Sequence, residues 1–190
     1  MSTQRQHVHR RSITLDGYVR TDGLIEVEAE LTDVKTYGFP SEDRGFIDAH
    51  EPIHHMHVRV AVNHELEVCE AEAKTLAGPY RICPKANDVF PELIGMKIAS
   101  GWRHKVRSAI GGRKGCTHIT ELMGPVATVI MQTYYGEESR RKRDSETGQM
   151  DMSDSESYKG LINSCVGYDE DGAVVKTMFP NGVSSSDQTS

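Results

Sequence analysis

Two side chains with metal-binding and nucleophilic chemistry lie two positions apart, where an apolar-periodic segment begins. They are Cys116 and His118, in the sequence Gly115-Cys116-Thr117-His118. Because the dipole at a helix N-terminus favours negative charge, a cysteine there is a better metal ligand or nucleophile than an average cysteine. The pair therefore predicts a metal or thiolate centre. Glu121 lies one turn after His118, as a candidate general base or as a first-turn carboxylate that complements the dipole.

Further candidate ligands lie in separate segments earlier in the chain. Four histidines fall within eight positions: His50, His54, His55 and His57. Cys83 comes directly before a proline, where a second helical pattern begins. Zinc and iron accept thiolate and imidazole ligands readily, so we predict a zinc or iron ion bound by residues from three separate segments. The predicted ligands are His54, Cys83, Cys116 and His118.

Each candidate residue also has a simpler interpretation. A free cysteine is often a small buried hydrophobe, which is our interpretation of Cys69 in a predicted strand and the alternative to ligation for Cys116. The histidine cluster alternatively forms a partly exposed sheet edge with one functional member. In a catalytic version of the site, the metal keeps an open position and His55 or Glu121 handles protons.

Composition and charge narrow the class of protein. A chain of 190 residues is long enough for one ordinary domain with its own core. The net charge of -6 provides no global field for nucleic acid, and acidic residues directly follow the basic run at 140–143. The sequence lacks a long apolar run and a signal-peptide core, and its four cysteines form no CxxC pair. We therefore expect a cytoplasmic protein that binds neither nucleic acid nor a membrane.

Alternating apolar and polar residues predict the strands that must position these ligands. The period-two pattern covers residues 13–19, 24–36, 54–62 and 66–75. Asp22-Gly23 is a turn signal, so the first two strands should form a hairpin. The alternation slips near Cys69, because Val68 and Ala71 cannot share a face of the strand without a bulge.

Helical spacing of apolar residues follows the strands. It covers residues 84–94, 102–110 and 117–134, and Pro125 predicts a kink or short break in the last of these. The predicted fold is therefore α+β, an antiparallel sheet covered on one face by helices. The predicted divisions are a metal-site domain at 1–136, a polar disordered linker at 137–157, a segment at 158–180 that packs on the domain as a hairpin, and a disordered tail at 181–190.

Four segments resemble an uncharacterised bacterial family of unknown function. They are Asp22-Gly23-Leu24 through Asp33, Ile53-His54-His55-Met56, Pro79-Tyr80-Arg81-Ile82-Cys83, and Gly115-Cys116-Thr117-His118-Ile119-Thr120-Glu121-Leu122. The resemblance covers roughly residues 9 to 135. It names a family without naming an activity.

A more distant resemblance is to the U-type iron–sulfur cluster assembly scaffolds. In these scaffolds a ligand-bearing turn leads into a strand, one cysteine precedes a helix, and a last cysteine opens a C-terminal amphipathic helix. His54, Cys83 and Cys116 fall at the corresponding places, although Ile82 replaces the glycine before the second cysteine and the first cysteine has no counterpart. The resemblance implies an iron–sulfur-related accessory module with a protein partner. The alternative is a small metal-dependent lyase or hydrolase that acts on a small organic substrate.

Overall fold

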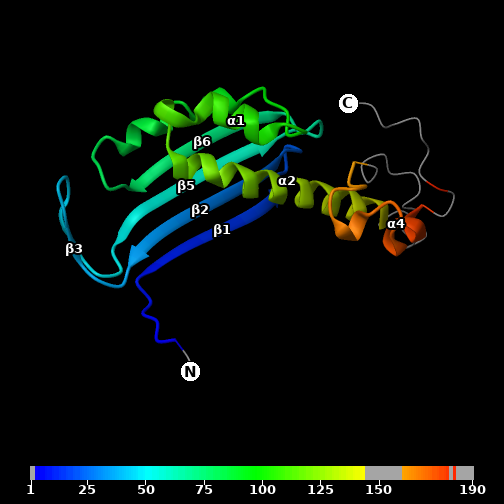
Figure 1. Cartoon of the computed structure of the whole chain (residues 1–190). Helices are drawn as coiled ribbons and strands as arrows, with labels where there is room; N and C mark the ends of the chain where they lie inside the picture. The colour runs from blue at the N-terminus through cyan, green and yellow to red at the C-terminus, as the bar shows by residue number, and fades with distance from the viewer. Residues whose placement is uncertain (1–2, 144–159, 180–181, 183–190) are drawn as a thin grey trace. The chain divides into compact units, whose positions relative to one another are not determined.

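A computed structural model of the chain describes residues 3–143, 160–179 and 182 (Figure 1). The chain divides into two compact units, Met1–Tyr134 and Tyr135–Ser190. Within the described ranges, none of the helices is both long and apolar enough to cross a membrane.

The first unit is built on a four-stranded antiparallel sheet with the order β1-β2-β5-β6. The strands are β1 His9–Val19, β2 Ile25–Lys35, β5 Pro52–Val62 and β6 Val68–Ala77. The predicted hairpin is confirmed, because β1 and β2 pair along their whole length. Gly23 at their turn has a φ of +89°, which favours a residue without a Cβ atom.

The irregularity predicted near Cys69 is a bulge. Ala61 of β5 pairs with Glu70, whereas the next residue, Val62, pairs with Val68. Cys69 is therefore the extra residue, and the bulge lets Val68 return to the core face at 1% exposure. The expectation that Cys69 is a buried hydrophobe is wrong, because its side chain is exposed.

A small second sheet lies between β2 and β5 in the chain. It consists of β3 Phe39–Ser41 and β4 Gly45–Ile47, which the sequence analysis did not predict. Asp43 in its turn accepts a hydrogen bond from the backbone N–H of Arg81 at 2.8 Å. The hairpin is thereby tied to the segment that leads into Cys83.

The helices of the first unit differ in detail from their prediction. Helix α1 spans Trp102–Ile110, as predicted, and α2 spans Thr117–Arg143 without a break at Pro125. Residues 84–94 form two 3-10 helices, η1 Cys83–Asn87 and η2 Phe90–Leu93, rather than one continuous helix. A proline lies in the first turn of each, a position where its missing N–H costs no hydrogen bond and where helices often begin. A short 3-10 helix, η3 Gly112–Lys114, connects α1 to the loop before α2.

Helix α2 extends beyond the predicted start of the linker. Residues 137–143 are helical, and Glu137 forms ion pairs with Arg140 and Arg141, three and four residues further on. Such pairs stabilise the exposed end of a helix. The remainder of the predicted linker, 144–157, lies outside the described residues.

The core lies on one face of the sheet, beneath the helices, as predicted. It combines inward-facing residues of the central strands with apolar residues of the helices, including Val27, Leu31, Met56, Val58, Val60, Trp102, Val106, Leu122, Val126 and Ile130. Trp102 of α1 donates a hydrogen bond to the carbonyl oxygen of Met123 in α2 at 2.9 Å. The opposite face of the sheet carries ion pairs instead, with Arg59 between Glu26 and Glu70. Burial of the apolar face is thus what fixes the helices on the sheet.

In the second unit, the structure describes two short helices within residues 160–179. They are η4 Val166–Tyr168 and α4 Ala173–Met178, and Val175 and Phe179 form a small buried cluster there. The predicted hairpin is wrong, because the turn that ends at Gly172 leads into a helix whose apolar residues recur four positions apart. Residues 158, 159, 180, 181 and 183–190 lie outside the described residues.

Gly115 provides a test of the packing between α1 and α2. An ideal Cβ atom at Gly115 would lie 2.0 Å from the carbonyl oxygen of Ile110. Gly115→Ala should therefore lower the free energy of unfolding by about 2 kcal/mol, as overpacking does. Gly124→Ala is the matched control. Gly124 lies inside helix α2, and a Cβ atom there would make only an ordinary contact, at 3.5 Å, with the side chain of Arg103. That change should raise stability by about 0.5–1 kcal/mol in urea denaturation. Equal effects of the two substitutions would contradict the packing described.

Candidate functional site

A buried carboxylate lies at the end of β2. Asp33 is 1% exposed and is the one buried polar or charged side chain among the residues that the structure describes. It follows Leu31 on the inward face of β2, and Arg11 lies directly opposite it in β1. Arg11 donates two hydrogen bonds to the carboxylate, from Nε to Oδ1 and from Nη2 to Oδ2, each at 2.8 Å. This bidentate pair compensates the buried charge.

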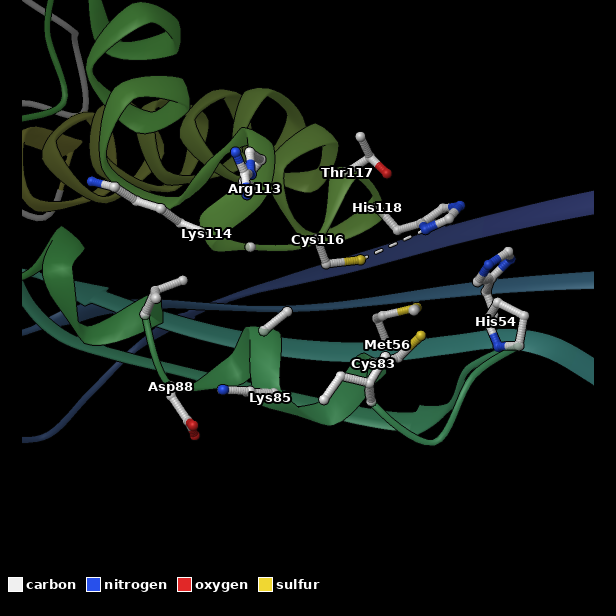
Figure 2. A pocket seen from close by; sticks show the side chains of 15 residues that line it. His54, Met56, Cys83, Lys85, Asp88, Arg113, Lys114, Cys116, Thr117 and His118 are labelled. Carbon is white, nitrogen blue, oxygen red and sulfur yellow. Dashed lines mark hydrogen bonds between the residues drawn. The ribbon is translucent and has the colours of Figure 1, made fainter. Parts of the chain in front are cut away.

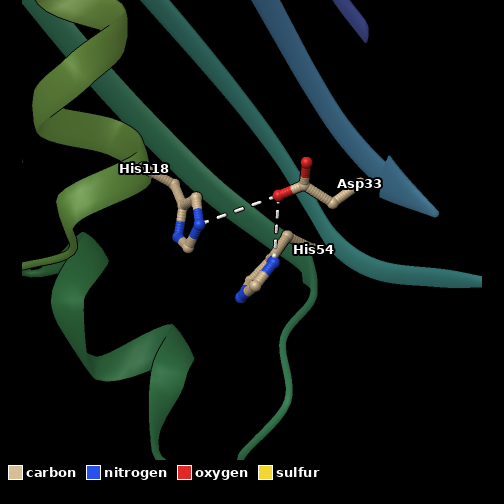
Figure 3. A group of neighbouring side chains, drawn as sticks. All are labelled: Asp33, His54 and His118. Carbon is tan, nitrogen blue, oxygen red and sulfur yellow. Dashed lines mark hydrogen bonds and ion pairs between the residues drawn. The ribbon is translucent and has the colours of Figure 1, made fainter. Parts of the chain in front are cut away.

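Three histidines surround the same carboxylate. His54 lies opposite Asp33 in β5, and its Nδ1 is 3.1 Å from Oδ2. His118, in the first turn of α2, places Nε2 3.7 Å from Oδ2 (Figure 3). His9 reaches the other oxygen, with Nε2 3.2 Å from Oδ1. Because the rings of His54 and His118 lie with centroids 3.8 Å apart, β2, β5 and α2 converge at one point.

The spacing of these groups suits a metal ion. One ligand atom from each of Asp33, His54 and His118 lies within 4.8 Å of the others. Nitrogen and oxygen ligands of tetrahedral zinc lie about 2.0–2.2 Å from the ion, and thus roughly 3.3–3.6 Å from one another. Oδ2 of Asp33 lies 3.1 Å from Nδ1 of His54 and 3.7 Å from Nε2 of His118, just below and just above that range. Two imidazoles and one carboxylate are also a ligand set of non-haem iron.

The local electrostatics favour neutral imidazoles beside an ionised carboxylate. Burial alone would raise the pKa of Asp33, but the hydrogen bonds and charge of Arg11, together with His9 and His54, outweigh burial and lower that pKa to about 2. Burial lowers the pKa of His54, and the neighbouring His118 lowers it further. Burial and then Arg11 lower the pKa of His118. Since metals bind unprotonated nitrogen, both histidines are prepared for ligation near neutral pH.

Both predicted cysteine ligands line a pocket with the two histidines. The pocket has a volume of about 590 Å³, and His54, Cys83, Cys116 and His118 all contribute to its wall (Figure 2). The carbonyl oxygen of Cys116 accepts a hydrogen bond from the backbone N–H of Thr120 at 2.9 Å, so Cys116 lies at the N-terminus of α2, as predicted. Its Sγ lies 3.7 Å from Nδ1 of His118. Within the described part of the chain, however, the metal-compatible group consists of Asp33, His54 and His118 and includes neither sulfur.

The two predicted catalytic residues lie apart from this cluster. His55 forms an ion pair with Glu30 on the opposite face of the sheet, because adjacent residues of a strand point to opposite sides. Glu121 pairs with Arg11 through Nη1 at 3.0 Å, and its side chain is 61% exposed. Glu121 therefore reaches the buried carboxylate of Asp33 only through Arg11.

Asp33 is the functional candidate that the sequence analysis missed. A signal was present, because Ile25, Val27, Ala29 and Leu31 alternate toward the core and Asp33 continues the same face. A carboxylate at a predicted buried position needs a compensating partner. The sequence does not show that this partner is Arg11, since the pairing depends on the register of β1 against β2.

The lowered pKa of Asp33 predicts how stability changes in acid. A folded-state pKa of about 2, against an ordinary value of 3.8, means that the carboxylate stabilises the fold above pH 3.8 and that this contribution is lost as pH falls through 2. The contribution amounts to about 2 kcal/mol. In urea denaturation of metal-free protein, the native chain should lose about that much more stability over this range than Asp33→Asn. Parallel pH profiles for the two proteins would contradict the assignment.

Comparison with known proteins places the chain in a family. No match was found among curated proteins or among solved structures. A family model described as "Protein of unknown function (DUF2889)" matches residues 9–132. The match spans β1 to most of α2, and so contains Asp33, His54 and His118. The chain therefore belongs to the DUF2889 family of proteins of unknown function.

Proposed function

We propose that this domain binds one transition-metal ion, zinc or iron, through Asp33, His54 and His118. The observation that supports this most directly is the convergence of one ligand atom from each residue within 4.8 Å. The three residues come from β2, β5 and α2, so the ion would join the sheet to the helix that covers it.

The surroundings of the three ligands match what metal sites require. Groups that ligate a metal are usually held by further hydrogen bonds, which fix their orientation and basicity. Asp33 is held in this way by Arg11 and His9. The lowered pKa values of both histidines reduce the competition between protons and the ion.

A three-ligand site supports the alternative of a small metal-dependent lyase or hydrolase. Zinc sites with three protein ligands leave a position for water or substrate, whereas structural sites are closed by four. His54 and His118 both line the 590 Å³ pocket, so an open position would face a space of the size that small organic substrates occupy. A bound ion there would polarise a carbonyl group or activate water.

A closed site would correspond to the iron–sulfur-related accessory module. In that arrangement Cys83 and Cys116 join His54 and His118 as ligands, and Asp33 only orients the imidazoles. The 3.7 Å between Cys116 Sγ and His118 Nδ1 supports it. The separation of both sulfurs from the Asp–His–His group supports the open site instead, which is the version that we adopt.

Metal content tests the proposal. Protein purified without an affinity tag or chelator should contain about one zinc or iron ion per chain, measured by inductively coupled plasma mass spectrometry. His54→Ala and His118→Ala should each reduce bound metal at least tenfold, because second-shell changes alone cost about 10–100-fold. His57→Ala is the matched control, since His57 lies on the other face of β5 and should not affect metal content. Metal near zero in the native protein, or an equal loss in His57→Ala, would contradict the proposal.

Cysteine variants separate the open site from the closed one. In the open site, Cys116→Ser and Cys83→Ser should keep the metal, as should Cys69→Ser, whose side chain is exposed in the bulge of β6. Competition with a chromogenic chelator would measure the affinity of each variant. Loss of metal in Cys116→Ser but not in Cys69→Ser would establish a thiolate ligand and the closed accessory site.

A further inference from the structure

The pocket beside the candidate metal site has two chemically different ends. Imidazole and sulfur groups gather at one end, from His54, His118, Cys83 and Cys116 (Figure 2). Three basic side chains lie toward the other end: Lys85 from η1, and Arg113 and Lys114 from η3 (Figure 2). The ligand end and the cationic end belong to one continuous space of about 590 Å³.

The three cations of the pocket are not neutralised by ion pairs within the described residues. Arg11, Arg20 and Arg59 all form ion pairs with carboxylates. By contrast, Lys85, Arg113 and Lys114 form no ion pair with any residue in the ranges that the structure describes. One carboxylate, Asp88, also lines the pocket, so this end keeps two positive charges in excess. The excess is local, because the whole chain has a net charge of -6.

Apolar side chains also line the pocket. They are Met56, Pro79, Ile82, Ala86 and Val89. A small-molecule site commonly combines such an apolar wall with a few polar groups that fix the orientation of the ligand. An occupant that matches this pocket therefore has an apolar body and an acidic group.

We propose that the pocket binds a small organic acid, with its carboxylate at the cationic end and its apolar body against the apolar side chains of the lining. The opposite end of the ligand faces His54 and His118. The inference names the substrate class for the proposed metal site and in that sense rests on it. Recognition of the acid by the three cations does not itself require the metal.

Benzoate and benzamide form a matched pair of probes, since they differ mainly in charge. Their affinities for metal-free and zinc-loaded protein can be measured by saturation-transfer difference NMR titration. Benzoate should bind both forms, and benzamide should bind at least about tenfold more weakly. The triple variant Lys85→Gln/Arg113→Gln/Lys114→Gln should lose about tenfold in benzoate affinity, because it removes the positive charge that attracts the carboxylate to this end of the pocket.

Lys105→Gln is the control for a change of net charge, since Lys105 lies in α1 and does not line this pocket. It should leave benzoate affinity unchanged, and metal content should stay constant in all these variants. Undetectable benzoate binding, equal binding of benzamide, or full affinity in the triple variant would overturn the inference. If charge-dependent benzoate binding persists in a protein with no metal affinity, the metal proposal fails and the acid site stands.

Discussion

The buried carboxylate of Asp33 is the constraint on which the site depends. A charge at 1% exposure is costly unless partners compensate it, and Arg11 does so with two hydrogen bonds of 2.8 Å. Arg11 and His54 lie opposite Asp33 in the neighbouring strands β1 and β5. A slip of one residue in either strand pair would turn these partners to the other face. The register of the sheet therefore determines the geometry of the site.

The third candidate ligand, His118, is positioned by apolar packing of a helix rather than by strand pairing. Apolar packing holds α2 on the sheet, and the hydrogen bond from Trp102 to Met123 joins it to α1. His118 in its first turn then reaches Asp33, and the preceding loop places Cys116 at the pocket wall. The site lies where a polar strand end meets a helix start. The proposed metal site lies on the side of this junction that faces the sheet, and the proposed acid site lies on the side that faces the 3-10 helices.

Local pattern was enough to predict much of the fold, including the four main strands, the bulge at Cys69 and helix α1. It did not predict that residues 83–93 form two 3-10 helices, each with a proline in its first turn. It also did not predict that α2 extends to Arg143. For the site, the sequence analysis named both His54 and His55, although strand alternation turns His55 to the opposite face of the sheet, where it pairs with Glu30. Strand alternation indicates that Asp33 lies on the core face. Its partners could not be identified from the sequence, because Arg11 and His118 lie 22 and 85 positions away.

X-ray absorption spectroscopy of the zinc-loaded protein would test the central claim most directly. Ligation by Asp33, His54 and His118 predicts only nitrogen and oxygen scatterers, at about 2.0–2.2 Å from the ion, with the multiple-scattering signature of imidazole. A sulfur shell at about 2.3 Å would show that a cysteine is a ligand and would contradict the open site. The same spectrum recorded on His118→Ala should lose part of the imidazole signal, and an unchanged spectrum would place the ion elsewhere.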